Sequence, residues 1–426
     1  MIDVKLLRDQ PDLVRDGCRR KHVDCDIDGL VRLDARRREI IALEETCQNE
    51  RNRAAKEIGA DKKNGRDTSA RQAEMKGLAD RIAGLARERR AIEAEFGALM
   101  LSTPNLPAAD VPEGADASGN AEASRWGEPK RFDFTPKPHW ELCEKLGLVD
   151  FARGAKVAGT GFILYRDRGA RLERALISWF LDLHTRRHGY IEYFPPFLAN
   201  NASMTGTGQF PKFADDYYTC DKDDGLSLIP TAEVPITNIH RDEILDGQAL
   251  PLKYCAYSAC FRREAGAAGK DTRGLLRVHQ FNKVELVNFT RAEDGLERLE
   301  GLRAEVSAVF EGLGLHYRVM KLCGGDMSFS AAKCYDFEVW APGVGKYLEC
   351  SSCSAFGDFQ ARRMAIRYRD ADRKTRIAHT LNASGAALPR TMAALLETWQ
   401  RADGSVEIPE VLRPYMNGLA VLEPEA

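Results

Sequence analysis

The residues best suited to chemistry lie in one stretch, FRREAGAAGKDTRGLLRVHQFNKVELV, which runs from Phe261 to Val287. In its second half, apolar residues of one parity alternate with polar and aromatic residues of the other. This alternation predicts a strand, because successive side chains of a strand point to opposite faces. The polar side would carry Arg277, His279, Phe281, Lys283 and Glu285, opposite Val278, Val284 and Leu286. A cation, an aromatic ring and a carboxylate would then point from one face of a sheet, either into solvent or toward a ligand.

The loop inside this stretch, Gly266 to Thr272 (GAAGKDT), superficially matches a phosphate-binding loop. That motif needs four residues between its glycines and a Ser or Thr directly after the lysine. Here two residues separate the glycines, and Asp271 follows Lys270. A phosphate-binding loop also leads into a helix, whose first amides hold the phosphates, whereas this loop leads into a predicted strand. We therefore do not expect the loop to cradle a phosphate. On the first flank, Arg262 and Glu264 share a parity and could join the charged face of a hairpin.

Length and composition restrict the class of protein. A chain of 426 residues suggests two or three structural units. The net charge of −2 does not by itself indicate a nucleic-acid partner, and no run of about 18 apolar residues predicts a membrane span. The N-terminus lacks a signal-peptide core, so we expect a cytoplasmic protein. Eleven scattered cysteines favour reduced thiols, and the Cys350–Cys353 pair lacks a second ligand pair for structural zinc.

Two segments near the N-terminus have the heptad pattern of a coiled coil. The turn expected between them is Gly59 to Gly65 (GADKKNG), which makes the helices antiparallel arms that project on the order of 40 to 50 Å. The seam of the first helix is Leu30, Leu33, Ile40, Cys47, Ala54 and Ile58, with charged Arg37, Glu44 and Arg51 also at seam positions. The seam of the second helix is Met75, Leu78, Ile82, Leu85, Ile92, Phe96 and Leu99, interrupted by Arg89.

The arm carries an excess of positive charge. Between Arg32 and Arg90 there are 16 Lys and Arg residues against 11 Asp and Glu residues, and the run Arg36, Arg37, Arg38 is part of this excess. A solvated helix face would explain the charge equally well at this stage. After the arm, residues 104–130 are rich in Pro, Gly, Ala and Ser and are interpreted as a linker. The predicted domains are therefore the arm 1–103, the linker 104–130 and one large domain 131–426.

Two helices can be predicted inside the large domain. Ala170 to Gly189 has one apolar stripe and ends at a glycine, and a short strand, Tyr190 to Tyr193, should follow before Pro195 and Pro196. Pro389 suits the first turn of a second helix, with Met392, Leu395, Leu396 and Trp399 on its buried stripe. Arg390 would then lie at the start of that helix.

Three further stretches join the first one: SLIPTAEVPITN (Ser227 to Asn238), YLECSSCSAFGDFQARRM (Tyr347 to Met364) and HTLNASGAALPRTMAALLE (His379 to Glu397). Together with the arm, they resemble the bacterial-type seryl-tRNA synthetases over almost the whole chain and in the family's order. The resemblance implies a class II synthetase of the α+β class, with an N-terminal antiparallel helical hairpin and an antiparallel sheet flanked by helices. It also implies a homodimer that forms seryl-adenylate from L-serine and ATP and transfers serine to the 3′ end of tRNA(Ser), and also of tRNA(Sec).

The resemblance also implies an ATP site on the sheet. Arg262 would grip the α-phosphate, Glu264 would read the adenine amino group, and Phe281 would stack beneath the ring. Arg277 would lie near the phosphates and Arg390 would close over the nucleotide. Glu349 and Ser352 match the positions that hold Mg²⁺, although strand parity alone places them on opposite faces, so a bulge or a strand end is required. The matching motifs also include Arg263, Cys350 and Ser351 in the ATP site.

For serine, the resemblance implies a polar pocket made by Thr231, Ala232, Glu233, Arg262, Glu285, Asn382 and Ser384. Glu233 would bind the ammonium group and Glu285 the hydroxyl. A pocket built to hydrogen-bond a hydroxyl rejects the analogue that lacks it by about 10⁴ to 10⁵. Departures from the usual family residues at Cys350, Ala355, Ala383 and Ala386 concern the shape of the pocket and leave its charged groups in place.

The family's arm reaches the long variable arm of tRNA, so the resemblance makes Arg36, Arg37 and Arg38 candidate tRNA contacts. Three alternatives stay open. One is a paralogue with the same chemistry in a biosynthetic or antibiotic-resistance role. The others are a non-enzymatic RNA-binding homologue, which should have lost groups such as Arg262 and Arg390, and a ligase for carrier proteins, which would not need the arm.

Overall fold

The structure is a computed structural model that describes residues 1–220, 222–265 and 273–425. It divides into two units: one contains Ile2–Arg19 and Val23–Pro104, and the other contains Met1, Arg20–His22 and Asn105–Ala426. The loop Gly266 to Thr272 lies outside the described residues. All eleven cysteines are free. No helix in the described part of the chain is both long and apolar enough to cross a membrane.

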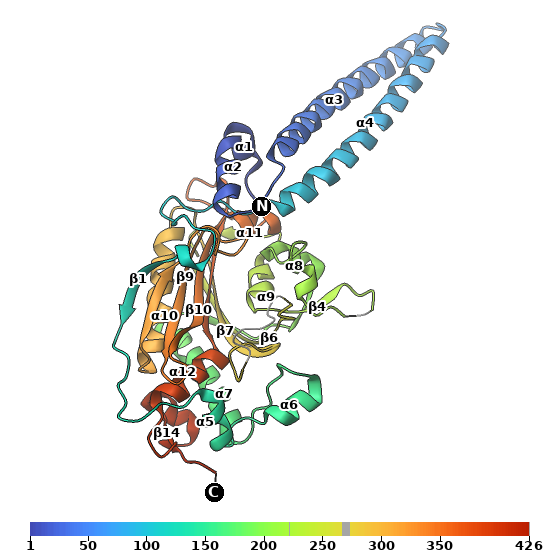
Figure 1. Cartoon of the computed structure of the whole chain (residues 1–426). Helices are drawn as coiled ribbons and strands as arrows, with labels where there is room; N and C mark the ends of the chain where they lie inside the picture. Colours follow the sequence, from blue (N-terminus) through green and yellow to red (C-terminus); the bar gives the residue numbers. More distant parts are fainter. Residues whose placement is uncertain (221, 266–272, 426) are drawn as a thin grey trace. The chain divides into compact units, whose positions relative to one another are not determined.

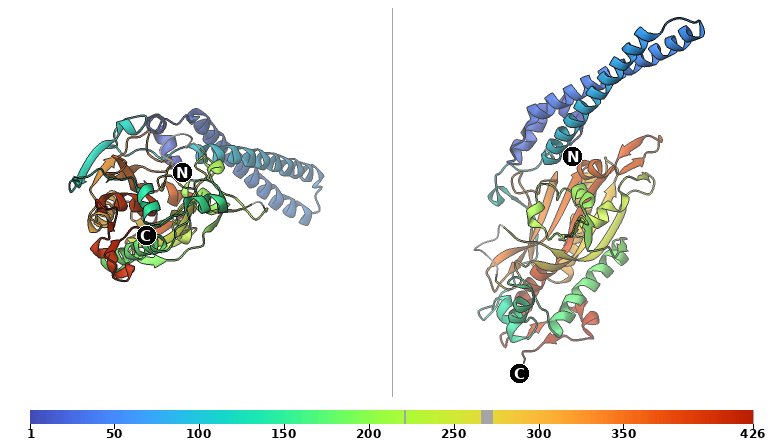
Figure 2. Two further views of the ribbon diagram at one scale, coloured as in Figure 1. Left: turned by 60° about the horizontal axis from the view of Figure 1, so that its bottom comes forward. Right: turned by 90° about the vertical axis from the view of Figure 1, so that its right-hand side faces the viewer.

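The first unit is built around the two long helices α3 (Ile27–Lys63) and α4 (Ser69–Ser102), which run side by side in both views of Figure 2. Two short helices, α1 (Val4–Asp9) and α2 (Pro11–Arg20), precede them (Figure 1). The predicted seam of the first helix is buried as expected, at Leu30, Leu33, Ile40, Cys47, Ala54 and Ile58. Two of the charged seam positions pair with each other: Arg89 Nε lies 3.0 Å from Glu44 Oε2, which closes the gap in the apolar pattern.

The predicted turn at Gly59 to Gly65 is wrong in its first half. Helix α3 continues through Gly59 to Lys63, and the chain turns only between Asn64 and Thr68. A solvent-exposed glycine inside a helix costs about 1 kcal/mol relative to alanine, which a long paired helix can tolerate. Gly65 has φ +69°, the left-handed conformation that ends helices, so this second glycine is the one at the turn.

The second unit contains an eight-stranded sheet with the order β1-β8-β9-β10-β13-β7-β6-β2. All neighbours are antiparallel except β2 and β6, which are parallel. The strands are β1 (Ala121–Trp126), β2 (Ile191–Tyr193), β6 (Leu252–Phe261), β7 (Gln280–Thr290), β8 (Tyr317–Lys321), β9 (Lys333–Ala341), β10 (Lys346–Gly357) and β13 (His379–Ala387). Strand β1 lies within the segment interpreted as a linker, where Pro and Gly composition gave no sign of backbone pairing.

One face of the sheet is covered by helices and forms the main core. Helices α7 (Arg168–Asp182), α10 (Gly295–Gly312) and α12 (Leu388–Trp399) supply Leu176, Phe310 and Leu395 to this core, and the sheet supplies Val284 and Leu286. Helix α7 passes into a π-helical turn, η2 (Leu183–Arg187), and the chain reaches β2 after Gly189, as the sequence predicted. The predicted Pro389 lies in the first turn of α12.

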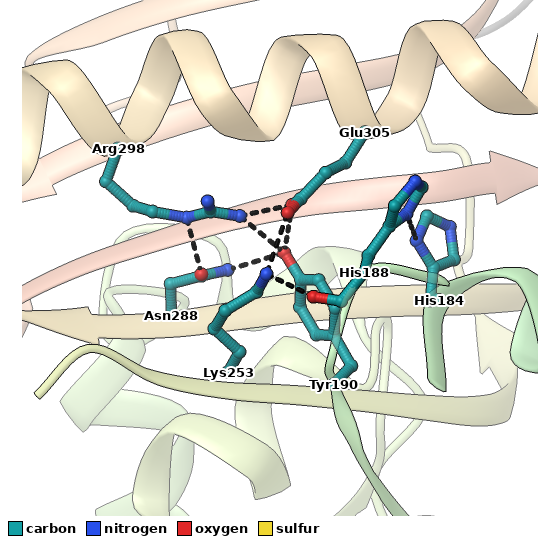
Figure 3. A network of polar contacts seen from close by, with 7 residues as sticks. All are labelled: His184, His188, Tyr190, Lys253, Asn288, Arg298 and Glu305. Atoms are coloured by element: carbon teal, nitrogen blue, oxygen red, sulfur yellow. Dashed lines mark hydrogen bonds and ion pairs between the residues drawn. The ribbon is translucent and has the colours of Figure 1, made fainter. Parts of the chain in front are cut away.

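A polar network lies on this covered face, between α10 and the sheet (Figure 3). Lys253 Nζ of β6 lies 2.8 Å from Glu305 Oε1 of α10. Tyr190 donates its hydroxyl to the other oxygen of Glu305 at 2.6 Å, and Arg298 Nε donates to Asn288 Oδ1 at 2.9 Å. Asn288 is on β7 with parity opposite to Glu285, so the network and the polar row predicted from the sequence lie on opposite faces.

Smaller elements complete the second unit. At one end of the other sheet face, α9 (Glu233–Thr237) and α11 (Phe359–Met364) pack with Val287 and Phe289. The remaining helices are α5 (His139–Lys145), α6 (Phe151–Ala158) and α8 (Asn201–Thr207), and the remaining strands are β3 (Leu198–Asn200), β4 (Leu226–Leu228), β5 (Ile244–Asp246), β11 (Arg367–Arg369), β12 (Thr375–Ile377), β14 (Val406–Glu407) and β15 (Val421–Leu422).

Candidate active site

A cavity of about 630 Å³ opens on the face of the sheet that carries the polar row. Most of the residues predicted for ATP and serine line it: Thr231, Glu233, Arg262, Glu264, Arg277, Phe281, Glu349, Cys350, Ser351, Ser352, Asn382, Ser384 and Arg390. Ala232 and Glu285 are buried directly behind its wall. Arg263 is not part of the wall, and its guanidinium lies over the Tyr218 ring at 5.6 Å. Strand pairing thus gathers residues that are more than 150 positions apart in the sequence.

One end of the cavity contains the residues predicted for ATP. The Arg262 guanidinium lies 5.1 Å from the centre of the Phe281 ring, and Arg277 Nε lies 2.6 Å from Glu264 Oε2. Glu264 has φ +51°, a left-handed conformation that a non-glycine residue adopts at a cost and that is concentrated at functional sites. Arg390 donates to Leu276 O at 3.0 Å and to Glu349 O at 2.8 Å, so the start of α12 is fixed against β10.

The bulge that Glu349 and Ser352 require is present in β10. The pairing of β10 with β9 shifts between Glu349 and Ser351, and the extra residue, Cys350, is buried in the main core. The shift lets Glu349 and Ser352 both reach the cavity. The strand partner of Ser352 is Asp336, a carboxylate that sequence reasoning missed although the alternation in KCYDFEVWA contains it. Burial and the charge of Glu349 raise the pKa of Asp336 well above its usual value.

The other end of the cavity, where serine is predicted to bind, is a hydrogen-bonded network around Glu285. Thr231 Oγ1 donates to Glu285 Oε2 at 3.1 Å, and Asn382 Nδ2 donates to Glu285 Oε1 at 2.9 Å. Lys283 Nζ donates to Thr231 Oγ1 at 2.8 Å and forms an ion pair with Glu285. Ser384 is the partner of Glu285 on the neighbouring strand. The side chains therefore form one connected polar floor.

Glu233 is the second carboxylate at this end. Burial, and then the charge of Glu285, raise the pKa of Glu233 to about 7. Gln360 Nε2 donates to Glu233 Oε1 at 2.6 Å and Thr380 Oγ1 donates to Gln360 Oε1 at 2.7 Å, so the carboxylate is held from outside the cavity. Gln360 lies in the DFQARR motif, which was recognised in the sequence without a role for this residue.

Comparisons with known proteins agree with this geometry. The model of the seryl-tRNA synthetase N-terminal domain matches residues 1–107, and the model of the class II tRNA synthetase core domain (G, H, P, S and T) matches residues 217–399. The serine–tRNA ligase of Pelotomaculum thermopropionicum is 53% identical over 420 residues, which are 99% of each chain. That of Carboxydothermus hydrogenoformans is 53% identical over 419 residues, which are 98% of each chain.

Solved structures are similar over the same extent. The seryl-tRNA synthetase from Pyrococcus horikoshii complexed with ATP has a TM-score of 0.94 at 36% identity, with all of both chains covered. The cytoplasmic serine–tRNA ligase from Naegleria fowleri in complex with AMP has a TM-score of 0.89 at 27% identity, with 100% of this chain and 99% of that chain covered.

The antiparallel sheet, with its polar face and the arginine at the start of α12, defines a class II aminoacyl-tRNA synthetase. Within that class, the helical arm and the full-length similarity are decisive, and the chain belongs to the seryl-tRNA synthetase family. Its activity is the ATP-dependent ligation of serine to tRNA. The specialised paralogue, the non-enzymatic homologue and the carrier-protein ligase are not favoured by this similarity.

Proposed function

We propose that serine and ATP meet at Arg262, between the two ends of the cavity. The observation that supports this most directly is the position of the Arg262 side chain: its guanidinium covers the Phe281 ring, while its Nε lies 3.4 Å from the carbonyl oxygen of Pro230, next to Thr231. A cation at this point would meet the α-phosphate as the serine carboxylate attacks it. One preorganised donor at a developing charge lowers a barrier by about 3 to 4 kcal/mol.

The same geometry supports the ATP assignments that the family resemblance implies. The adenine would stack on Phe281 and replace Arg277 as the neighbour of Glu264, whose carboxylate could then accept from the adenine amino group. Arg277, released from the 2.6 Å ion pair, would turn to the phosphates. Arg390 would close over the nucleotide from the start of α12, where Pro389 and the bonds to Leu276 and Glu349 hold it. Arg263, Cys350 and Ser351 would contribute backbone and surrounding contacts.

The donor set between β9 and β10 fits Mg²⁺. Glu349 and Ser352 line the cavity, and the Asp336 carboxylate lies beside them. Mg²⁺ in proteins commonly binds one or two carboxylates and completes its coordination with water and substrate phosphates. The two carboxylates and one hydroxyl present here agree with that ligand set. When bound, the ion would supply charge neutralisation at the phosphates and at the departing pyrophosphate. The bulge at Cys350 would place the oxygens of Glu349 and Ser352 on the same face of the sheet.

Serine would bind at the network around Glu285. Its ammonium would meet Glu233, its carboxylate would point toward Arg262, and its hydroxyl would donate to Glu285. Thr231, Asn382 and Ser384 would complete the polar wall, with Ala232 packed behind them. An amino acid without the hydroxyl would leave Glu285 with an unused acceptor in a buried site, and such sites discriminate strongly.

We also infer that the chain acts as a homodimer through α7 and β2. Strand β2 is an edge of the eight-stranded sheet, and Ile191 in this strand and Phe194 directly after it are 57% and 76% exposed. Exposed apolar edges favour pairing with a second chain. Phe194→Asp should yield monomers, because a charge would be buried in the interface. Light scattering at micromolar concentration checks this, and a wild-type protein that is already monomeric would contradict the inference.

The arm is the proposed contact for tRNA(Ser), and by extension for tRNA(Sec), in the cytoplasm where tRNA is charged. Arg36, Arg37 and Arg38 are the candidates from the sequence, and each also has an intramolecular partner: Glu39 and Glu88 for the first, Asp34 for the other two. Arg38 is the most exposed of the three, at 57%, so we expect it to reach phosphates most readily. Exposed Arg53, Lys56 and Arg87 further along the arm would extend this surface.

The central assignment is tested with Arg262→Ala. Serine-dependent ATP–pyrophosphate exchange should fall at least a hundredfold, roughly the effect of losing one transition-state donor. The thermal unfolding temperature should change little, because the side chain borders the cavity. Arg125→Ala, which removes an exposed ion pair with Glu122 on β1, is the matched control. Full exchange activity in the Arg262 variant would remove the assignment.

A further inference from the structure

Lys283 is a buried cation at the amino-acid end of the cavity that none of the roles above uses. It lies on β7 between Phe281 and Glu285, on the same face, and is 5% exposed. Its Nζ contacts Thr231 Oγ1 at 2.8 Å and the Glu285 carboxylate. A buried ammonium group is unfavourable unless it is paired, so neighbouring groups must compensate the charge of Lys283.

The neighbours show what that charge does. Thr231 Oγ1 accepts from Lys283 and from the Glu233 amide (3.2 Å), so its own proton is directed to Glu285. The Glu285 carboxylate therefore forms an ion pair with Lys283 and accepts hydrogen bonds from Thr231 and Asn382, which lie in three separate parts of the chain. Each of these contacts favours the ionised carboxylate. Lys283 fixes both the charge of Glu285 and the direction of the Thr231 hydroxyl.

Other titratable groups face Glu285 from every side. They are Glu233 from α9, Cys260 from β6, Arg262 directly after β6, Cys353 from β10 and Lys283 from its own strand. Burial raises the pKa of Glu285, whereas Lys283 and, more weakly, Arg262 oppose this rise. Among the described residues, Lys283 is the cation that forms an ion pair with Glu285. Without it, the pKa of Glu285, a buried carboxylate beside Glu233, would rise further, and the protonated form would be favoured.

We propose that Lys283 is a positioning and specificity-determining residue: it keeps Glu285 an ionised acceptor for a neutral hydroxyl side chain and excludes amino acids whose side chain carries an amine in place of that hydroxyl. This rests on the proposed function, in which Glu285 accepts from the substrate hydroxyl. A side-chain ammonium would compete with Lys283 for the same carboxylate and meet its positive charge. A neutral hydroxyl avoids this repulsion.

The test uses the full-length protein with Lys283→Met, which keeps most of the side-chain volume and removes the charge. In ATP–pyrophosphate exchange, the KM for serine should rise roughly tenfold or more, with a smaller change in kcat, because Glu285 loses its ionised state in the free enzyme. The pH dependence of this KM should also extend to higher pH than in the wild type, with the KM falling as the pH rises. Discrimination of serine against 2,3-diaminopropionate, measured as the ratio of kcat/KM, should shrink roughly tenfold or more.

Lys253→Met is the matched control, because it removes another lysine, partly buried, that is paired with a glutamate, on the opposite face of the sheet (Figure 3). It should lower stability and leave both the pH profile of the serine KM and the discrimination unchanged. If Lys283→Met does not fold, Lys283→Gln provides the same two measurements, since its amide can still donate to Thr231 without a charge. An unchanged pH profile and unchanged discrimination in a folded Lys283 variant would overturn the proposal.

Glu285→Gln separates this proposal from the proposed function. If Glu285→Gln leaves the KM for serine unchanged, the assignment of the hydroxyl to Glu285 is wrong. If Glu285→Gln raises the KM while the Lys283 variants keep the wild-type pH profile and full discrimination, the role of Lys283 alone is wrong.

Discussion

At the scale of single residues, the proposed binding of the serine ammonium by Glu233 would depend on the ionisation of that carboxylate. The carboxylate is buried, its pKa is raised to about 7, and Gln360 donates the hydrogen bond that opposes this rise. An ammonium group is bound by the ionised carboxylate, so the apparent affinity for serine should decrease as the pH falls below about 7. Gln360 therefore acts through Glu233 and not by touching the substrate, which makes it a positioning residue.

We predict that Gln360→Leu moves this pH dependence upward by roughly one pH unit, because the ionised form of Glu233 loses a short hydrogen bond. The measurement is the KM for serine in ATP–pyrophosphate exchange between about pH 6 and 9. At high pH the variant should approach the wild-type KM, which a general loss of structure would not reproduce. Wild-type pH dependence in the folded variant would show that Gln360 does not control Glu233.

Part of this residue-scale arrangement was accessible from the sequence. Period-two alternation correctly placed Phe281, Lys283 and Glu285 on one face, because strand geometry fixes the parity of side chains. The positions of Gln360 and Asp336 were not accessible in the same way, since each acquires its neighbour through pairing or packing with a distant segment. The roles assigned to the other site residues come from the family resemblance and remain predictions.

At the scale of elements, the sequence predicted the strands and helices better than their irregularities. The alternation in β10 required a bulge without locating it, and the pairing shift at Cys350 locates it. The end of α3 was placed too early because glycine was given more weight than the helix pairing that holds it. Arg89 and Glu44, each an interruption of an apolar pattern when read alone, form an ion pair only once the two helices lie side by side.

The base of the arm also depends on charge. Asp34 of α3 is 1% exposed and forms ion pairs with Arg8 of α1 and with Arg37 and Arg38 of its own helix. The hydrogen bond from Arg8 lowers the pKa of Asp34, and nearby arginine charges act in the same direction. Because the folded-state pKa is lower than the unfolded value of about 3.9, the stability that Asp34 contributes is complete above that value. It is lost as the pH falls through the folded-state pKa.

We predict that Asp34→Asn weakens the attachment of α1 to α3 by roughly 1 to 3 kcal/mol at pH 7, because three arginines lose a buried counter-ion. Hydrogen exchange of the α1 amides and of the first turns of α3 measures this local stability. In urea unfolding, the difference from wild type should shrink as the pH falls below the unfolded-state pKa of about 3.9 and through the lower folded-state pKa. Asp28→Asn is the control, because Asp28 pairs with Arg15 while 80% exposed and should change stability by less than about 1 kcal/mol. Equal effects of the two substitutions would contradict the prediction.

At the scale of the whole molecule, the two units divide the reaction into steps that can be separated. Every residue proposed for the formation of seryl-adenylate belongs to the unit that contains Asn105–Ala426. The helical hairpin contributes none of them. Adenylate formation should therefore proceed without the hairpin, whereas transfer needs the tRNA to be recognised and held.

Shortening the arm tests this division. Removing residues 46–86 and joining the helices with a short glycine-serine turn keeps the Arg36–Glu88 and Arg89–Glu44 ion pairs, so the base of the hairpin should stay folded. We predict nearly unchanged serine-dependent ATP–pyrophosphate exchange and a fall of roughly a hundredfold or more in kcat/KM for charging of tRNA(Ser). The anticodon sequence differs among serine tRNAs, so a synthetase that charges all of them must contact another part of the tRNA.

The salt dependence of tRNA binding should also become weaker, because exposed cations such as Arg53 and Lys56 would no longer displace counter-ions from phosphates. A shortened enzyme that charges tRNA(Ser) at the full-length rate would return the arm to the alternative of a solvated, charged hairpin.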